Sequence, residues 1–163
     1  MIPPMQTTPS TALDALALVF QSLNWKFDRL PNPERICSGF KLDKKNNAHL
    51  VLMSDDRGES LLLGCSLHFT PPRGSIAKIR KFLRAETAAF HGLSVEFDPA
   101  QGIRLSARCW LPDVDLPLDT LRPVFEPSLH YLLRASNTLY PALLKFLRHQ
   151  ERLCRSDDFH LPS

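Results

Sequence analysis

The segment LSVEFDPAQGIRLSARCWL, residues 93–111, decides the fold class of this chain. Apolar and polar residues alternate before the turn sequence DPAQG and again after it, which predicts an antiparallel hairpin with one buried and one wet face. The alternation pairs Phe97 with Ile103 on the buried face. The same register places Glu96 opposite Arg104 on the wet face, so the charges agree with the apolar pattern.

Three further segments complete a predicted antiparallel sheet of about five strands. Residues 36–42 and 48–54 flank the polar turn Lys44–Asn47, and residues 59–69 follow the turn sequence DDRG. Trp25 and Phe27 indicate a short extended piece before them, and the prolines that follow permit only an edge strand or a loop there.

The strands 48–54 and 59–69 are apolar on both faces. A hairpin that pairs Ser54 with Glu59 places Leu52 opposite Leu61 on one face. The other face then carries Val51, Met53 and Leu62. This pattern is typical of a strand covered on both sides, and equally of one whose second face meets another protein.

Helical spacing of apolar residues predicts helices around the sheet. Residues 12–23 form the first, and residues 75–91 the second, with Gly92 as its C-terminal stop. Residues 118–153 read as two or three consecutive pieces, because prolines interrupt them. The interrupting residues are Pro123, Pro127 and Pro141. The predicted class is α+β, in the order α-β-β-β-α-β-β-α, with the sheet packed against helices.

Length and composition predict one globular domain. The chain has 163 residues, of which 44% are hydrophobic and 23% charged, enough for a single core over residues 10–154. Residues 1–9 read as a flexible arm and residues 155–163 as a flexible tail. We expect a cytoplasmic, membrane-free protein, because no secretory signal or membrane-spanning stretch is evident and the four cysteines have no paired spacing.

The sequence offers no catalytic, cofactor or metal site. Cys65 and His68 stand three apart in a predicted strand, so their side chains point to opposite faces and cannot act as nucleophile and base. Glu86 falls on the apolar stripe of the second helix and is expected to be buried with a partner. The six histidines lack metal-ligand spacing. We therefore expect no enzyme and no cofactor.

Two surfaces remain as candidates for binding. The first is apolar and comprises Val51, Met53, Leu62 and Trp110, which points to a protein partner or a homodimer. The second is a basic cluster on and before the second helix, comprising Arg73, Lys78, Arg80, Lys81 and Arg84. This cluster lacks interleaved aromatics and a glycine-rich anion loop, and the net charge of +3 is mild. A solvated helix face is therefore the preferred interpretation, with nucleic-acid or phosphate binding as the alternative.

Four stretches resemble the YbjN family of bacterial proteins, which has a type III secretion chaperone-like fold. They are LDALALVFQSLNWKF at 13–27, IAKIRKFLRAETAAF at 76–90, VEFDPAQGIRLSARCWL at 95–111 and LLRASNTLYPALLKFL at 132–147. The chain departs from the pattern in its proline-rich stretch 116–127.

The resemblance implies binding rather than turnover. The family is described as sensory transduction regulators without an assigned reaction, and the related chaperones are non-enzymatic dimers that hold partner polypeptides on apolar surfaces. The implied function is a protein-interaction module with a regulatory or chaperone-like role. A dedicated chaperone of a secreted effector is the alternative, although this chain lacks the acidic charge usual among such chaperones.

Overall fold

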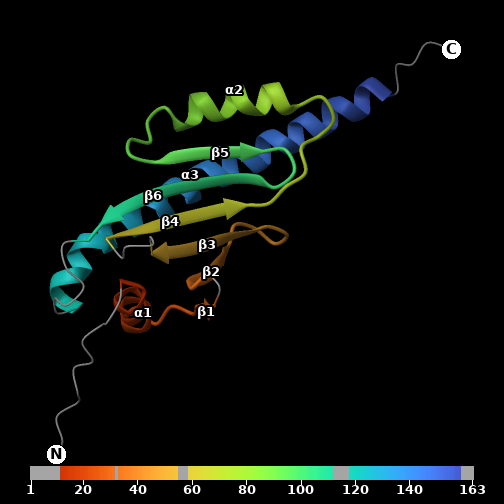
Figure 1. Ribbon diagram of the computed structural model, residues 1–163. Coiled ribbons are helices and arrows are strands. Elements are labelled where there is room, and N and C mark those ends of the chain that lie inside the picture. Colours follow the sequence, from red (N-terminus) through yellow and green to blue (C-terminus); the bar gives the residue numbers. More distant parts are fainter. Residues whose placement is uncertain (1–11, 32, 55–58, 112–117, 159–163) are drawn as a thin grey trace, which may run out of the picture.

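The computed structural model describes residues 12–31, 33–54, 59–111 and 118–158, and in these residues the chain forms three helices and six strands (Figure 1). In chain order they are α1 (Ala12–Ser22), β1 (Asp28–Leu30), β2 (Arg35–Lys41), β3 (Asn47–Ser54), β4 (Ser60–Leu67), α2 (Ile76–Thr87), β5 (Ser94–Asp98), β6 (Gly102–Trp110) and α3 (Leu118–Asp158).

The strands form one antiparallel sheet in the order β1-β2-β3-β4-β6-β5. The predicted hairpin is confirmed as β5 and β6. Phe97 lies opposite Ile103 and Glu96 opposite Arg104, in the predicted register. The α+β class is confirmed as well. β6 pairs with both β5 and β4, so the hairpin attaches to the centre of the sheet.

The predicted register of β3 and β4 is wrong by two residues. Ser54 pairs with Leu61 rather than with Glu59, and Leu52 therefore lies opposite Leu63. The segment 55–58, which would contain the turn, lies outside the described residues. A shift of two residues preserves the alternation of faces, so each side chain still points to the predicted side of the sheet.

The sheet has one strand more than the roughly five predicted. The extra strand is β1, three residues that pair with the first half of β2. Its place at the edge agrees with the restriction that the neighbouring prolines impose, because an edge strand does not need every backbone N–H for pairing.

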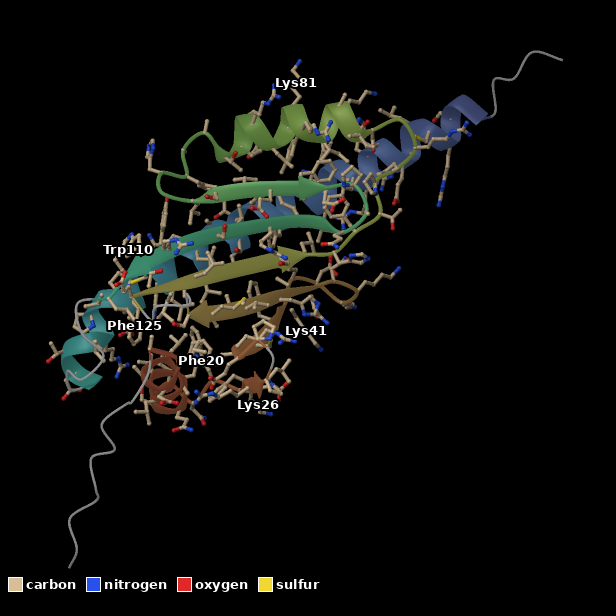
Figure 2. All side chains as sticks on the ribbon, viewed as in Figure 1. Phe20, Lys26, Lys41, Lys81, Trp110 and Phe125 are labelled. Carbon is tan, nitrogen blue, oxygen red and sulfur yellow. The ribbon has the colours of Figure 1, made fainter. Side chains whose placement is uncertain are left out.

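The core lies between one face of the sheet and the helices α1 and α3. α3 contacts β4 and β6 and runs behind them in Figure 1, and α1 packs against α3, β2, β3 and β4. Phe20, Phe125 and Tyr140 are fully buried in this layer, and Figure 2 shows the first two on their helices. Burial of each such side chain stabilises the fold by about 1.5–3 kcal/mol.

The prediction that α3 is broken into pieces is wrong, because α3 is one helix of 41 residues. The prolines Pro123, Pro127 and Pro141 all lie on its exposed side, where water can bond the carbonyls that lose a helical partner. Its opposite side buries Leu121, Phe125, Leu129, Leu132, Leu139, Tyr140, Leu143 and Leu147. This long apolar stripe outweighs the local cost of about 3 kcal/mol per proline. The helix also continues to Asp158, four residues into the predicted tail.

α2 is shorter than predicted and ends at Thr87, although Gly92 has the positive φ of 79° expected of a stop. Ile79 and Leu83 are its buried residues. The expected burial of Glu86 is wrong, because its side chain is exposed. α2 lies beyond the edge strand β5 in Figure 1. The side of the helix that meets the core is narrow, with Ile79 and Leu83 buried and Phe82 half-buried, and Glu86 lies outside it in solvent.

Candidate protein-binding face

The face of the sheet opposite α1 and α3 is uncovered by any helix or strand that the structure describes (Figure 1). We call this surface the open face. Its central members, read from the alternation along β3, β4 and β6, are Val51, Met53, Ser60, Leu62, Gly64, Ser66, Arg104, Ser106, Arg108 and Trp110.

All four residues predicted to contact a partner lie on the open face. Met53 stands opposite Leu62, and Val51 stands one pair further along the same two strands. Leu62 is 37% exposed and Trp110 is 64% exposed. Val51, Met53 and Leu62, which we call the apolar strip, line one groove of about 500 Å³, and Glu96, Arg104 and Arg108 are the charged residues of the same lining. Trp110 lies outside this groove, at the end of β6 (Figure 2).

Two arginines of β6 run beside the apolar strip. The Arg108 Nη1 donates a hydrogen bond of 2.9 Å to the Ser60 Oγ, and the guanidinium carbon of Arg108 lies 5.8 Å from the centre of the Trp110 ring. Leu62 stands directly opposite Arg108 in the ladder. The arginine therefore borders the strip and holds an aromatic ring at its end.

Arg104 leans toward β4 across a glycine. Its Cδ would lie 3.6 Å from a Cβ atom placed on Gly64, and its Nε lies 3.5 Å from the Ser66 Oγ. Because Gly64 has no side chain, the aliphatic part of Arg104 can lie flat on the strand.

Neither arginine forms an ion pair with a carboxylate among the described residues. Glu96 stands opposite Arg104 in the ladder, but Arg104 is directed to the other side. The sequence pattern predicts Arg104 only as the partner of Glu96, and neither arginine is among the residues predicted to contact a partner. Arg104 and Arg108 are separated from Trp110 by an even number of residues on the same strand, and this spacing indicates that all three side chains lie on the open face.

Cys65 and His68 lie apart, as the strand parity predicts. Cys65 is fully buried on the helix side of β4. His68 follows β4, is exposed, and its Nδ1 lies 2.7 Å from the Gln101 carbonyl oxygen. Burial raises the pKa of the Cys65 thiol to about 11, which disfavours the thiolate that nucleophilic attack requires. The arrangement does not assemble a nucleophile and a base.

The five residues of the basic cluster are all exposed. Arg80 turns back toward the sheet, with its guanidinium carbon 5.9 Å from the centre of the Phe97 ring. Lys81 extends away from the molecule in Figure 2. The cluster therefore lies on α2 and the loop before it, at a different place from the open face.

A second groove, of about 540 Å³, lies between the α1–β1 connection, β2, β3 and α3. Trp25, Phe40 and Leu133 contribute apolar lining, and Lys26 and Lys41 are its charged residues (Figure 2). This groove could not be predicted from the sequence, because its lining comes from segments that are distant along the chain.

The described residues offer neither a metal site nor a membrane-spanning helix. No group of three or more His, Cys, Asp or Glu side chains is placed to hold a metal ion. None of the helices combines the length and the apolar character that crossing a bilayer requires.

The buried Cys65 predicts a loss of stability in alkali. The pKa of its thiol is raised from the ordinary 9.0 to about 11 by burial, so the folded state keeps a proton that the unfolded state releases. The stabilisation is complete below pH 9 and is lost between pH 9 and pH 11, up to about 3 kcal/mol. We expect urea unfolding measured across this pH range to show a steeper decline for the wild type than for Cys65→Ala. Parallel curves would contradict the assignment.

No family model and no curated protein matches this chain. A chain in the solved structure titled "Crystal Structure of the ExsC-ExsE Complex" is similar in shape, with a TM-score of 0.49 and 20% sequence identity. The superposition covers 83% of this chain and 96% of that chain.

Proposed function

We propose that this protein is a non-enzymatic interaction module that binds another polypeptide on its open face. The observation that carries the proposal is the apolar strip, which lies in the middle of a sheet whose other face the helices already occupy. Apolar groups gathered on an uncovered sheet face are typical of contact with a partner.

The composition of the open face supports this proposal. Trp110 is the most exposed large hydrophobic residue in the part of the chain that the structure describes, and tryptophan and arginine are enriched where protein interfaces release most binding energy. Arg108 holds the Trp110 ring from one side. A partner that covers the ring would remove its apolar surface from water, and each Å² so buried would stabilise the complex by about 25 cal/mol.

The role we propose for this binding is regulatory or chaperone-like. The resemblance of four sequence stretches to the YbjN family supports a regulator, and the chaperone-like fold implied by that resemblance supports the holding of an effector polypeptide. We place the protein in a bacterial cytoplasm. The four cysteines, Cys37, Cys65, Cys109 and Cys154, are free thiols, which supports a reducing compartment.

The proposal predicts that charge in the apolar strip abolishes binding and leaves the fold intact. Val51 and Leu62 are partly exposed, so aspartate at both positions can reach water, whereas a partner would have to bury two unpaired carboxylates. We expect Val51→Asp/Leu62→Asp to weaken partner binding at least about 100-fold. Mass by light scattering reports self-association, calorimetry reports binding of a captured partner, and a thermal melt reports folding.

Ile76→Asp is the matched control, because Ile76 is an apolar residue of similar exposure, 36%, at the start of α2. We expect this variant to bind as the wild type does. Loss of folding in the double variant would show that the strip belongs to the core. A folded double variant with unchanged mass and unchanged binding would reject the proposal.

A further inference from the structure

We infer that the occupant of the open face is an acidic polypeptide segment of another protein. In this arrangement its apolar side chains cover Val51, Met53 and Leu62, and its carboxylates pair with Arg104 and Arg108. The inference rests on the proposed function and specifies the chemistry of the partner.

The charge on the open face carries the inference. Arg104 and Arg108 both lean toward β4, over Gly64 and onto Ser60. Four residues apart on one strand, they are separated by roughly 13 Å along β6. Their hydrogen-bond acceptors on the face are serine hydroxyls. Glu96 lines the same groove as the two arginines but forms no described ion pair with either, so the groove holds one carboxylate for two guanidinium groups. A partner that covers the groove must bring acceptors of negative charge to these groups.

A second copy of the chain fits this face less well. It would bring the same two arginines into the interface, and each chain already carries a net charge of +3. Each copy brings two arginines and one carboxylate, Glu96, in the groove lining, so an interface between two copies keeps an excess of guanidinium charge, which is unfavourable to bury. A foreign acidic segment provides the carboxylates and avoids the repulsion.

Selection from a library of random linear peptides tests the inference. We expect peptides selected on the wild type to combine large apolar residues with Asp or Glu. Arg104→Glu/Arg108→Glu is expected to bind these peptides at least about ten-fold more weakly, and selection on that variant should enrich Lys and Arg instead. Affinity for the wild type should fall as salt is added, because salt screens the attraction between the exposed arginines and the carboxylates of the approaching peptide.

Lys78→Glu/Lys81→Glu is the matched control, with the same change of charge on the exposed side of α2. It is expected to select the same acidic peptides as the wild type. Arg104→Gln/Arg108→Gln removes both charges without adding repulsion, and serves if the reversed variant does not fold.

The outcomes separate this inference from the proposed function. The wild type could instead select neutral or basic peptides that no longer bind Val51→Asp/Leu62→Asp. This result would overturn the inference of an acidic partner and support the open face as the binding site. A wild-type dimer that dissociates in the same double variant, with no peptide enriched, would make a second copy the occupant. A monomer that enriches no peptide on this face would overturn both.

Discussion

Tyr140→Ala is expected to lower the free energy of unfolding by about 3–5 kcal/mol, as removal of a large buried aromatic side chain does. Tyr140 lies on α3, is fully buried, and donates a hydrogen bond from its hydroxyl to the Cys65 carbonyl oxygen of β4. The side chain therefore joins the long helix to the middle of the sheet. Urea denaturation followed by circular dichroism measures the loss.

Tyr140→Phe separates the ring from the hydroxyl. It retains most of the buried volume and removes only the hydrogen bond, so we expect a loss of about 1–3 kcal/mol. Burial raises the pKa of the Tyr140 hydroxyl, so the wild type should also lose stability above pH 10 in a way that the Phe variant does not. A loss below about 1 kcal/mol in Tyr140→Ala would show that α3 is not anchored at this point.

Gly102→Ala is expected to destabilise the protein by about 3 kcal/mol or more. Gly102 begins β6 with φ of +107°, a conformation that other residues rarely adopt. A Cβ atom there would lie 2.2 Å from the Leu67 carbonyl oxygen, so β4 and the hairpin would have to separate. Because the same hairpin positions Arg104, the variant is also expected to weaken binding at the open face.

Gly74→Ala is the control for the clash. Gly74 also has a positive φ, of +72°, but a Cβ atom there meets nothing within 4 Å. Only backbone strain remains, and we expect a loss of about 1–2 kcal/mol. Equal losses at the two positions in urea denaturation would show that the contact with Leu67 is not decisive.

Local alternation accounts for most of what sequence analysis predicted correctly. The parity of Val51 and Leu62 follows from the period of two along each strand, and a register error of two residues leaves it unchanged. The same argument separates Cys65 from His68. These predictions depend on neighbours along the chain, whose relation is fixed by backbone geometry.

Features that depend on how distant segments pack together were predicted wrongly or not at all. Pro141 and the two prolines before it do not break α3, because the sheet offers a continuous apolar surface to the other side of the helix. Glu86 is exposed because the side of α2 that meets the core is narrow and does not include it. The Arg104 side chain can lie over β4 only because Gly64, 40 residues earlier in the chain, has no side chain there.

The sequence by itself determined the α+β class, the hairpin register and the division of side chains between the two faces, because backbone periodicity links each residue to its neighbours. The tertiary structure decided which of those faces the helices cover, the continuity of α3, and the placing of Arg104 and Arg108 beside the apolar strip. These features arise where segments distant in the chain pack together. There, the burial of a shared apolar surface outweighs local preference.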